Sequence, residues 1–528
     1  MLVLTLVAAA ALAKGTAVVG RLDGTWLERL AVKEARRYVE LLVGDVPTLH
    51  QLGDVATPAN ASIFVVTVGK DAATDGIGSW DAAYAAASSA LTSADSHLLH
   101  TLSNGAIVCA GASATSTLYA VYSLAEELGA GFYLDGDVLP KADAGKLDAL
   151  RARGVRRMFA SRFGQRGLQP YNNFEVGPDW WQLENYKATA TQMTKLKMNV
   201  WGFHNYPLRE PMVWVGDAAG FDAPTGEVRP GGAYPTSWAV IKDTSTFCCG
   251  AAQLFASDDW GNTDVMLPLA KTTAAETLNR AAEFERGAFG WAHDHAAVHT
   301  VVGIQFPLRI PPKLAAANVT VESVYAGIFA RIVAAKIPIA KFWLWSAEPM
   351  ENHGTGRGLS QNNSAWATMA DELRIAKSAL AATPGATFSL GTAGWCLGPG
   401  DNASFFAEVL PAAENPTFVV SAINGELGWQ NPDAAYANIE GERAWSIPWM
   451  EDDLSLGSAQ LWVNRTFAYA DRSAEYKSDG LLGLLWRTWE TAPQTRALAQ
   501  AGWAHDAGAA ASPSSATAAL YGEWCAAR

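Results

Sequence analysis

The feature that most constrains this chain is an alternation of short apolar segments with longer amphipathic ones, which runs from about residue 155 to residue 510. The apolar segments are rich in β-branched and aromatic residues, as strands are, and helical spacing of apolar residues marks the stretches between most of them. Eight such units predict an α/β fold, a (β/α)8 TIM barrel. The expected strands lie near 162–169, 198–204, 298–307, 339–346, 387–395, 417–424, 444–450 and 480–487.

Residues 17–150 predict a small α/β domain that precedes the barrel (155–510). Strands are expected at 17–24 and 62–69, and amphipathic helices at 25–44 and 116–130. Ser103-Asn104-Gly105 indicates a hairpin turn between two further strands. Residues 131–140 are expected to form a strand, and the charged segment 141–154 a linker.

The first residues of the chain and its sequons indicate a secreted or lumenal protein. Residues 1–13 are apolar and end in Ala11-Leu12-Ala13, which fits a signal-peptide cleavage site. The tail 511–528 is partly low-complexity and is expected to be an exposed connection before a short helix. Asn-x-Ser/Thr sequons begin at Asn60, Asn318, Asn362, Asn402 and Asn464, which favours an N-glycosylated, eukaryotic-type protein.

Charge and motifs exclude several partners and cofactors. The formal net charge of −13 argues against nucleic acid and anionic membrane surfaces, because both attract basic patches. The segment GTAGWCLGPG lacks the Lys-Ser/Thr of a phosphate-binding loop. His293, His295 and His299 precede the third strand, at the amino-terminal end of the barrel, and are expected in a solvated loop; the alternative, a metal-dependent hydrolase, requires them to converge with a carboxylate. The sequence therefore predicts no cofactor and no metal.

The carboxyl ends of barrel strands form the active face of such folds, so the strand list is also a list of site candidates. Carboxylates, amides, arginines and tryptophans gather at these positions, a mixture that core packing does not require. The candidates for substrate binding are Arg166, His204, Asn205, Trp345, Asn424, Glu426, Trp449, Asp453, Trp486 and Arg487.

The segment RAWSIPWMEDDL carries the strongest signal, because three consecutive acids follow an apolar strand. Glu451, Asp452 and Asp453 repel one another unless they face a polar cavity or solvent. Trp449 beside them offers a flat apolar surface for a sugar ring, although a tryptophan there also fits a buried core. The alternative interpretation is a solvated acidic turn.

A small α/β domain followed by a barrel resembles the α-glucuronidase, hexosaminidase and α-N-acetylglucosaminidase groups of glycoside hydrolases. The resemblance is carried by KEARRYVELLVGDVP and TLYAVYSLAEELGAGFYLDGDVLP in the first domain, and by RGLQPYNNFEVGPDWW, KMNVWGFHNYP, IPWMEDD and GLLGLLWRTWE in the barrel. The adjacent Asp-Glu pair that hexosaminidases carry at the end of the fourth strand is absent there, because Ala347 precedes Glu348.

The resemblance implies a glycoside hydrolase that acts on an oligo- or polysaccharide with two carboxyl groups, by a retaining mechanism. Glu348, at the end of the fourth strand, corresponds to the acid/base, and burial beside Trp345 would raise its pKa. Glu451, at the end of the seventh strand, corresponds to the nucleophile, with Asp452 next in order. The alternative from another class is a catalytically inactive carbohydrate-binding protein on a glycosidase scaffold.

Overall fold

The computed structural model forms two compact units. The first comprises Met1–Gly164, Thr194–Lys197 and Gly502–Arg528, and the second Gln165–Met193 and Met198–Ala501. The structure describes residues 15–52, 62–69, 77, 79, 81–170, 178, 181–203, 212–230, 274–308, 310, 312–346, 364–394, 406–423, 432, 434–441, 443–450, 463–485 and 491–504. The predicted signal peptide (1–13) and the tail (511–528) lie outside the described residues.

The first unit is built on a six-stranded sheet with the order β2-β1-β3-β5-β4-β8. Four strands are parallel, and β4 pairs antiparallel with both β5 and β8. The bounds are β1 (Ala17–Gly20), β2 (Thr48–Gln51), β3 (Ser62–Thr67), β4 (His97–Thr101), β5 (Ile107–Gly111) and β8 (Arg156–Phe159). The hairpin predicted at Ser103-Asn104-Gly105 joins β4 to β5 and is confirmed.

Helices cover both faces of this sheet. On one face, α2 (Trp26–Val43) packs against α5 (Ala114–Glu127), and an added Cβ at Gly20 of β1 would approach Val32 of α2. On the other face, Val19 and Phe64 pack in one cluster with Tyr84 of α4 (Ala82–Ser89). The helix α2 begins with a capping box between Thr25 and Glu28, which satisfies backbone N–H groups that the first turn leaves without partners.

Two predictions for the end of this domain are wrong. Residues 131–140 form the hairpin β6 (Gly131–Tyr133) and β7 (Gly136–Val138) instead of one strand, because the chain turns at Leu134 and Asp135. The expected linker forms helix α6 (Gly145–Arg153), and the chain then adds β8 to the first sheet. Charge at α6 therefore marks an exposed helix face and not a connection.

The end of the described chain also belongs to the first unit. Ser161 and Trp503 form an antiparallel bridge, flanked by backbone hydrogen bonds from Arg162 to Gly502 and from Ala504 to Ala160. The ring of Trp503 lies edge-on to His97 of β4, with centroids 5.0 Å apart, and Phe159 stacks on the same His97 at 4.6 Å. Residues 502–504 thus complete an aromatic cluster of the first unit.

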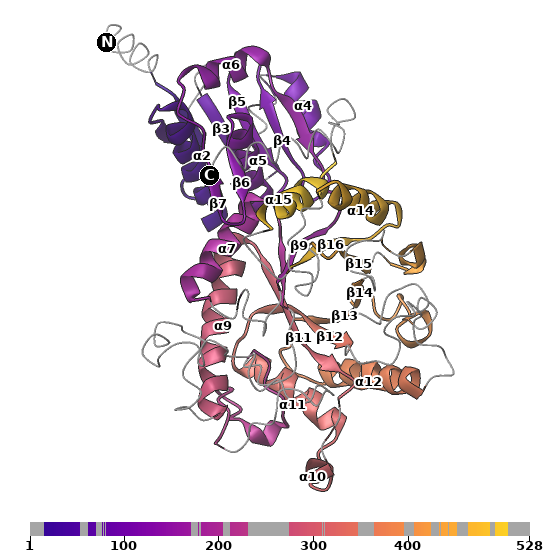
Figure 1. The fold of residues 1–528 in the computed structure, drawn as a ribbon. Helices are drawn as coiled ribbons and strands as arrows, with labels where there is room; N and C mark the ends of the chain where they lie inside the picture. The colour runs from indigo at the N-terminus through magenta and orange to yellow at the C-terminus, as the bar shows by residue number, and fades with distance from the viewer. Residues whose placement is uncertain are drawn as a thin grey trace. The chain divides into compact units, whose positions relative to one another are not determined.

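The second unit is a closed barrel of eight parallel strands in the order β10-β11-β12-β13-β14-β15-β16-β9 (Figure 1). The bounds are β9 (Gln165–Pro170), β10 (Val200–Gly202), β11 (His299–Phe306), β12 (Ile339–Ser346), β13 (Ser389–Gly394), β14 (Val419–Ile423), β15 (Ala444–Ile447) and β16 (Gly480–Leu485). All eight expected strands are present, so the predicted fold class is confirmed.

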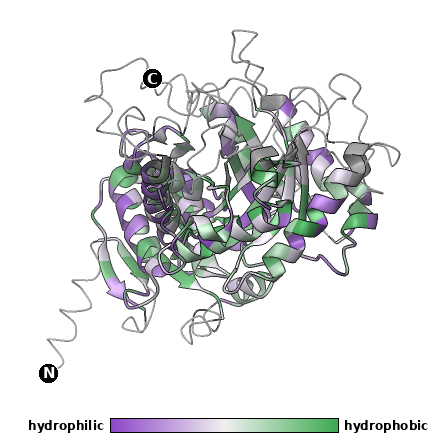
Figure 2. Cartoon of the chain, turned by 90° about the horizontal axis from the view of Figure 1, so that it is seen from below, coloured by the Kyte–Doolittle hydropathy of each residue, from purple (hydrophilic) through white to green (hydrophobic). Residues whose placement is uncertain are grey.

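Helices lie between the barrel strands, and their residues alternate between hydrophilic and hydrophobic (Figure 2). They are α7 (Leu183–Lys195), α9 (Ala274–Ala296), α10 (Pro312–Ala315), α11 (Val321–Ala334), α12 (Ser364–Ala381), α14 (Val463–Glu475) and α15 (Ala492–Ala501), with 3-10 turns η3 (Ala218–Gly220) and η7 (Ala434–Asn438).

His293 and His295 lie in the last turn of α9, so the prediction of a loop there is wrong. No helix among the described residues is long and apolar enough to cross a membrane.

Large and small residues alternate inside the barrel. Trp343 is 1% exposed and Trp445 is 2% exposed, and their ring centroids lie 6.2 Å apart. Glycines on other strands make room for them. A Cβ at Gly202 would lie 2.7 Å from Cη2 of Trp343, and one at Gly480 would lie 2.4 Å from Cγ of Trp445. The lumen is therefore a packed core at this level, as expected for a barrel of this size.

Candidate active site

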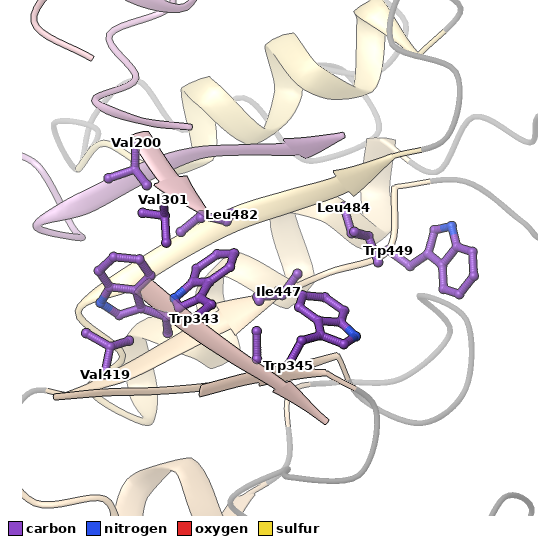
Figure 3. Close-up of a cluster of buried hydrophobic side chains, with 11 residues drawn as sticks. Val200, Val301, Trp343, Trp345, Val419, Ile447, Trp449, Leu482 and Leu484 are labelled. Atoms are coloured by element: carbon purple, nitrogen blue, oxygen red, sulfur yellow. The ribbon is translucent and has the colours of Figure 1, made fainter. Parts of the chain in front are cut away.

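Aromatic residues lead from the barrel core to the carboxyl ends of the strands. Trp343 lies among Val200, Val301 and Val419, whereas Trp449 lies beside Leu484 where the strands end (Figure 3). Trp345 lies between these levels, with its ring centroid 6.4 Å from that of Trp343. The series of indole rings provides apolar surface along the lumen up to its carboxyl mouth.

The chain after β15 is held against β16, and this fixes Trp449. Trp449 forms a parallel bridge with Leu484, the Leu484 N–H donates to Pro448 O at 2.9 Å, and the Met450 N–H donates to Leu484 O at 2.8 Å. Gln494 at the start of α15 donates its amide Nε2 to Met450 O. The three residues that precede Glu451 in the sequence are therefore fixed to the carboxyl half of the neighbouring strand.

Gln169 brings a polar group into this apolar lumen. It pairs in register with Leu484, which belongs to the buried lumen cluster. The lumen cluster consists of Val200, Val301, Trp343, Trp345, Ala393, Val419, Trp445, Ile447, Trp449, Leu482 and Leu484. An added Cβ at Gly202 would lie 3.4 Å from Oε1 of Gln169. The side chain is 0% exposed, and neither amide atom has a hydrogen-bond partner among the described residues. The indole N–H of Trp343 is unpartnered in the same way. Buried polar groups are normally satisfied, so these unpartnered donors and acceptors distinguish this level of the lumen from an ordinary apolar core.

A buried carboxyl group holds the turn after the third strand. Glu372 of α12 accepts hydrogen bonds from the Leu308 N–H at 2.9 and 2.8 Å, and from the Tyr325 hydroxyl at 2.6 Å. Its exposure is 3%, and burial raises the pKa of Glu372 to about 7, against the effect of both hydrogen bonds. Helices α11 and α12 thereby position the chain where it leaves β11 on the carboxyl side of the barrel.

Three of the predicted site residues lie among the described residues. Trp345 and Trp449 come together in the lumen cluster. Arg166 is the second residue of β9, and it pairs with Leu481, on the other side of the strand from Gln169. Arg166 is 2% exposed, and it is placed near the amino-terminal end of the strand and away from the carboxyl mouth. Trp201 also faces outward and packs on Tyr186 of α7, with centroids 5.4 Å apart.

The other predicted site residues lie outside the described residues. They are Glu348, Glu451, Asp452, Asp453, His204, Asn205, Asn424, Glu426, Trp486 and Arg487. Their roles stay predictions. The structure fixes where the strands that precede them end: β12 ends at Ser346 and β15 at Ile447.

Two residues of the site region were not among the candidates for catalysis or substrate binding. Gln169 lies two residues after Gly167 in the first barrel strand, so both face the same side, but the sequence does not show that this side is the lumen. Glu372 has no signal in the sequence, because one acid on an amphipathic helix usually faces solvent. Among the described residues, no group of three or more His, Cys, Asp or Glu is arranged to hold a metal ion.

The fold and this aromatic lumen define a (β/α)8 barrel preceded by an α/β domain. No protein-family model matches the chain. No curated protein matches it either. Among solved structures it is similar to a family GH115 4-O-methyl-α-glucuronidase with specificity for decorated arabinogalactans. That likeness has a TM-score of 0.54 and 11% identity, and covers 95% of this chain and 58% of the other. The chain thus spans less than two thirds of that enzyme's length.

Two further structures are also glycoside hydrolases. The chain matches the Streptomyces plicatus N-acetyl-β-hexosaminidase with a TM-score of 0.49 and 12% identity, over 97% of this chain and 91% of that one. It matches a GH138 enzyme targeting pectin rhamnogalacturonan II with a TM-score of 0.47 and 9% identity, over 92% of this chain and 47% of that one. The likeness to the GH115 enzyme confirms the predicted resemblance in fold, an α/β domain with a TIM barrel of the α-glucuronidase type.

Proposed function

We propose that this protein is a glycoside hydrolase whose active site lies at the carboxyl mouth of the barrel. The observation that carries the proposal is the unpartnered, buried amide of Gln169 inside a lumen lined by Trp345 and Trp449. Sugars present apolar ring faces and hydroxyl groups together, and indole surfaces beside free amide donors and acceptors match both. The fold shared with a GH115 α-glucuronidase supports the same reaction class.

The proposed chemistry uses two carboxyl groups on either side of the glycosidic bond. Glu348, two residues after β12, acts as the acid that protonates the leaving oxygen, and then as the base that activates water. Glu451, two residues after Trp449, attacks the anomeric carbon, and Asp452 is the next candidate for that role. The reaction retains the anomeric configuration if the carboxyl groups lie about 5 Å apart, and inverts it at about 6.5–9.5 Å.

Hydrolysis of aryl glycosides of both anomers, including uronides and N-acetylhexosaminides, tests this proposal. We expect activity on one sugar, and a loss of about 10³-fold or more in kcat/KM for Glu348→Gln and for Glu451→Gln. Glu184→Gln is the matched control, because it makes the same change at an exposed position of α7. Full activity of Glu348→Gln would refute its role. Binding of an oligosaccharide without any hydrolysis would favour the catalytically inactive carbohydrate-binding protein.

We also propose that the protein is secreted or lumenal and carries N-glycans. Asn318, the first residue of one sequon, is exposed in the turn before α11, where a glycan has room. Expression in a eukaryotic secretory host should give a protein whose mass falls on treatment with an N-glycan-cleaving amidase. Substitution Asn318→Gln should remove one such glycan, and an unchanged mass would contradict the assignment of that site.

A further inference from the structure

The described residues form a cavity at the amino-terminal ends of the barrel strands. Its volume is ≈ 410 Å³. Gln165, Ser389 and Val419, the first residues of β9, β13 and β14, contribute to its wall. Lys341 near the start of β12 and Trp445 near the start of β15 also line it. The cavity therefore lies at the end of the barrel opposite the proposed active site.

Two cationic side chains of this cavity are anchored to one short segment of backbone. The Lys341 ammonium donates to Thr417 O at 3.0 Å and to Ser389 Oγ at 2.8 Å. The Arg443 guanidinium donates through Nη1 to Asn415 O at 3.3 Å and to Leu410 O at 3.0 Å. Because Asn415 and Thr417 are two residues apart, the segment before β14 brings both cations to the same side of the cavity.

Both cations keep hydrogen-bond donors that these contacts do not use. Lys341 has three N–H donors and bonds two acceptors. Arg443 uses Nε on Glu440 O and Nη1 on two carbonyls, which leaves Nη2. The acceptors are carbonyls and a hydroxyl, and neither cation forms a salt bridge with a carboxylate among the described residues. Carbonyl dipoles hold the two groups in place without neutralising their charge.

The surroundings make the positive charge of Lys341 costly. Its ammonium lies over the Trp445 ring, 5.6 Å from the ring centre, and this cation–π contact offsets only part of that cost. Burial lowers the pKa of Lys341 to about 8, although Asp479, which also lines the cavity, acts in the opposite direction. The lining itself carries two cations and one carboxylate, while Glu440, which is not part of the lining, also acts on Arg443. The negative charge of an anion in the cavity would therefore offset the free-energy cost of keeping Lys341 charged away from water.

We propose that this cavity binds a small oxyanion, of the phosphate or carboxylate type, between Lys341 and Arg443. Charge-assisted hydrogen bonds from an ammonium and a guanidinium to one oxyanion are strong and directional. The volume admits a free phosphate ion or the carboxylate end of an acidic monosaccharide. The site is separate from the chemistry proposed for the carboxyl mouth, and it does not depend on that function.

Calorimetric titration of the full chain with inorganic phosphate, and separately with glucuronate, tests the proposal. We expect saturable binding of one equivalent of at least one of the two anions by the wild type. Affinity should fall at least about tenfold in Lys341→Met, which removes one charge-assisted hydrogen bond. Lys33→Met is the matched control, because it removes the same charge from an exposed position of α2. Tighter binding of phosphate or of glucuronate identifies which source of oxyanion the cavity prefers.

A protection experiment on the wild type covers the case in which Lys341→Met fails to fold. Trace acetylation of the native protein, read by peptide mass spectrometry, reports the reactivity of each lysine. The anion that binds should slow acetylation of Lys341 several-fold and leave Lys33 unchanged. The proposal would be overturned if the titrations of both anions showed only heats of dilution and no binding. It would also be overturned by equal affinities in wild type and Lys341→Met, or by equal acetylation of Lys341 with and without the anion.

Discussion

The buried carboxyl group of Glu372 makes a sharp prediction about how stability depends on pH. Burial raises its pKa from 4.5 to about 7 in the folded protein. That difference corresponds to about 3 kcal/mol, since each pKa unit is worth about 1.4 kcal/mol. The folded state holds this proton more tightly than the unfolded state. The stabilising contribution of Glu372 is therefore complete below pH 4.5, declines as the pH rises toward 7, and is lost above it.

Substitution Glu372→Gln isolates this contribution, because glutamine keeps the shape and does not titrate. Other groups titrate in the same range, so the quantity to follow is the difference in free energy of unfolding between wild type and variant. We expect the difference, wild type minus variant, to fall by about 3 kcal/mol between about pH 4.5 and pH 8. Urea unfolding monitored by tryptophan fluorescence measures it, because Trp343, Trp345 and Trp445 report on the barrel.

The control is Tyr325→Phe, which leaves the carboxyl group in place and removes the 2.6 Å hydrogen bond from the tyrosine hydroxyl. That bond lowers the pKa of Glu372, so its loss should shift the decline to higher pH. If the difference in free energy of unfolding between wild type and Glu372→Gln stays constant with pH, burial does not dominate the pKa of Glu372. A difference that grows with pH would show that the two hydrogen-bond donors keep Glu372 ionised.

Two substitutions inside the barrel give further predictions. Gly480→Ala places a Cβ 2.4 Å from Trp445 Cγ and should lower the free energy of unfolding, measured with urea, by about 1–3 kcal/mol. Gly290→Ala on α9 is the control, because no atom lies within 4 Å of its added Cβ, and it should not destabilise the protein. Equal effects of the two substitutions would refute the steric argument. Gln169→Leu removes a buried amide without partners and should raise the free energy of unfolding by about 1–3 kcal/mol, while it lowers hydrolysis of the sugar that the wild type cleaves. Lower stability together with unchanged hydrolysis would contradict the assigned role of Gln169.

The barrel was predictable because each of its strands can be recognised from its own residues. Segments such as IAKFWLWS and GLLGLLWR are short and mostly apolar, which favours buried strands, and the apolar residues between them recur with the period of a helix. Eight repeats leave few alternatives to closure. The first domain was less predictable at its end, where a glycine-rich hairpin and the charged helix α6 have no strong period.

The site was predictable only at the level of strand ends. The sequence indicates which residues follow each strand, but the pairing register decides which side chains enter the lumen. Lys341 illustrates this point, because it lies in an otherwise apolar strand, and its partners are Ser389 of β13 and Thr417 in the segment before β14. The bonds of Glu372 to Leu308 and Tyr325 likewise join segments about 50 to 60 residues apart in sequence.

The return of residues 502–504 to the first unit has a consequence for synthesis on the ribosome. When residue 164 has been added, every strand of the first sheet exists, but Trp503 has not yet been made, and His97 and Phe159 lack their third aromatic partner. At usual elongation rates the barrel takes about 20 to 70 seconds to synthesise. During that interval, the nascent first domain presents an open aromatic cluster. Chaperones that recognise exposed aromatic residues have a defined window in which to act on it.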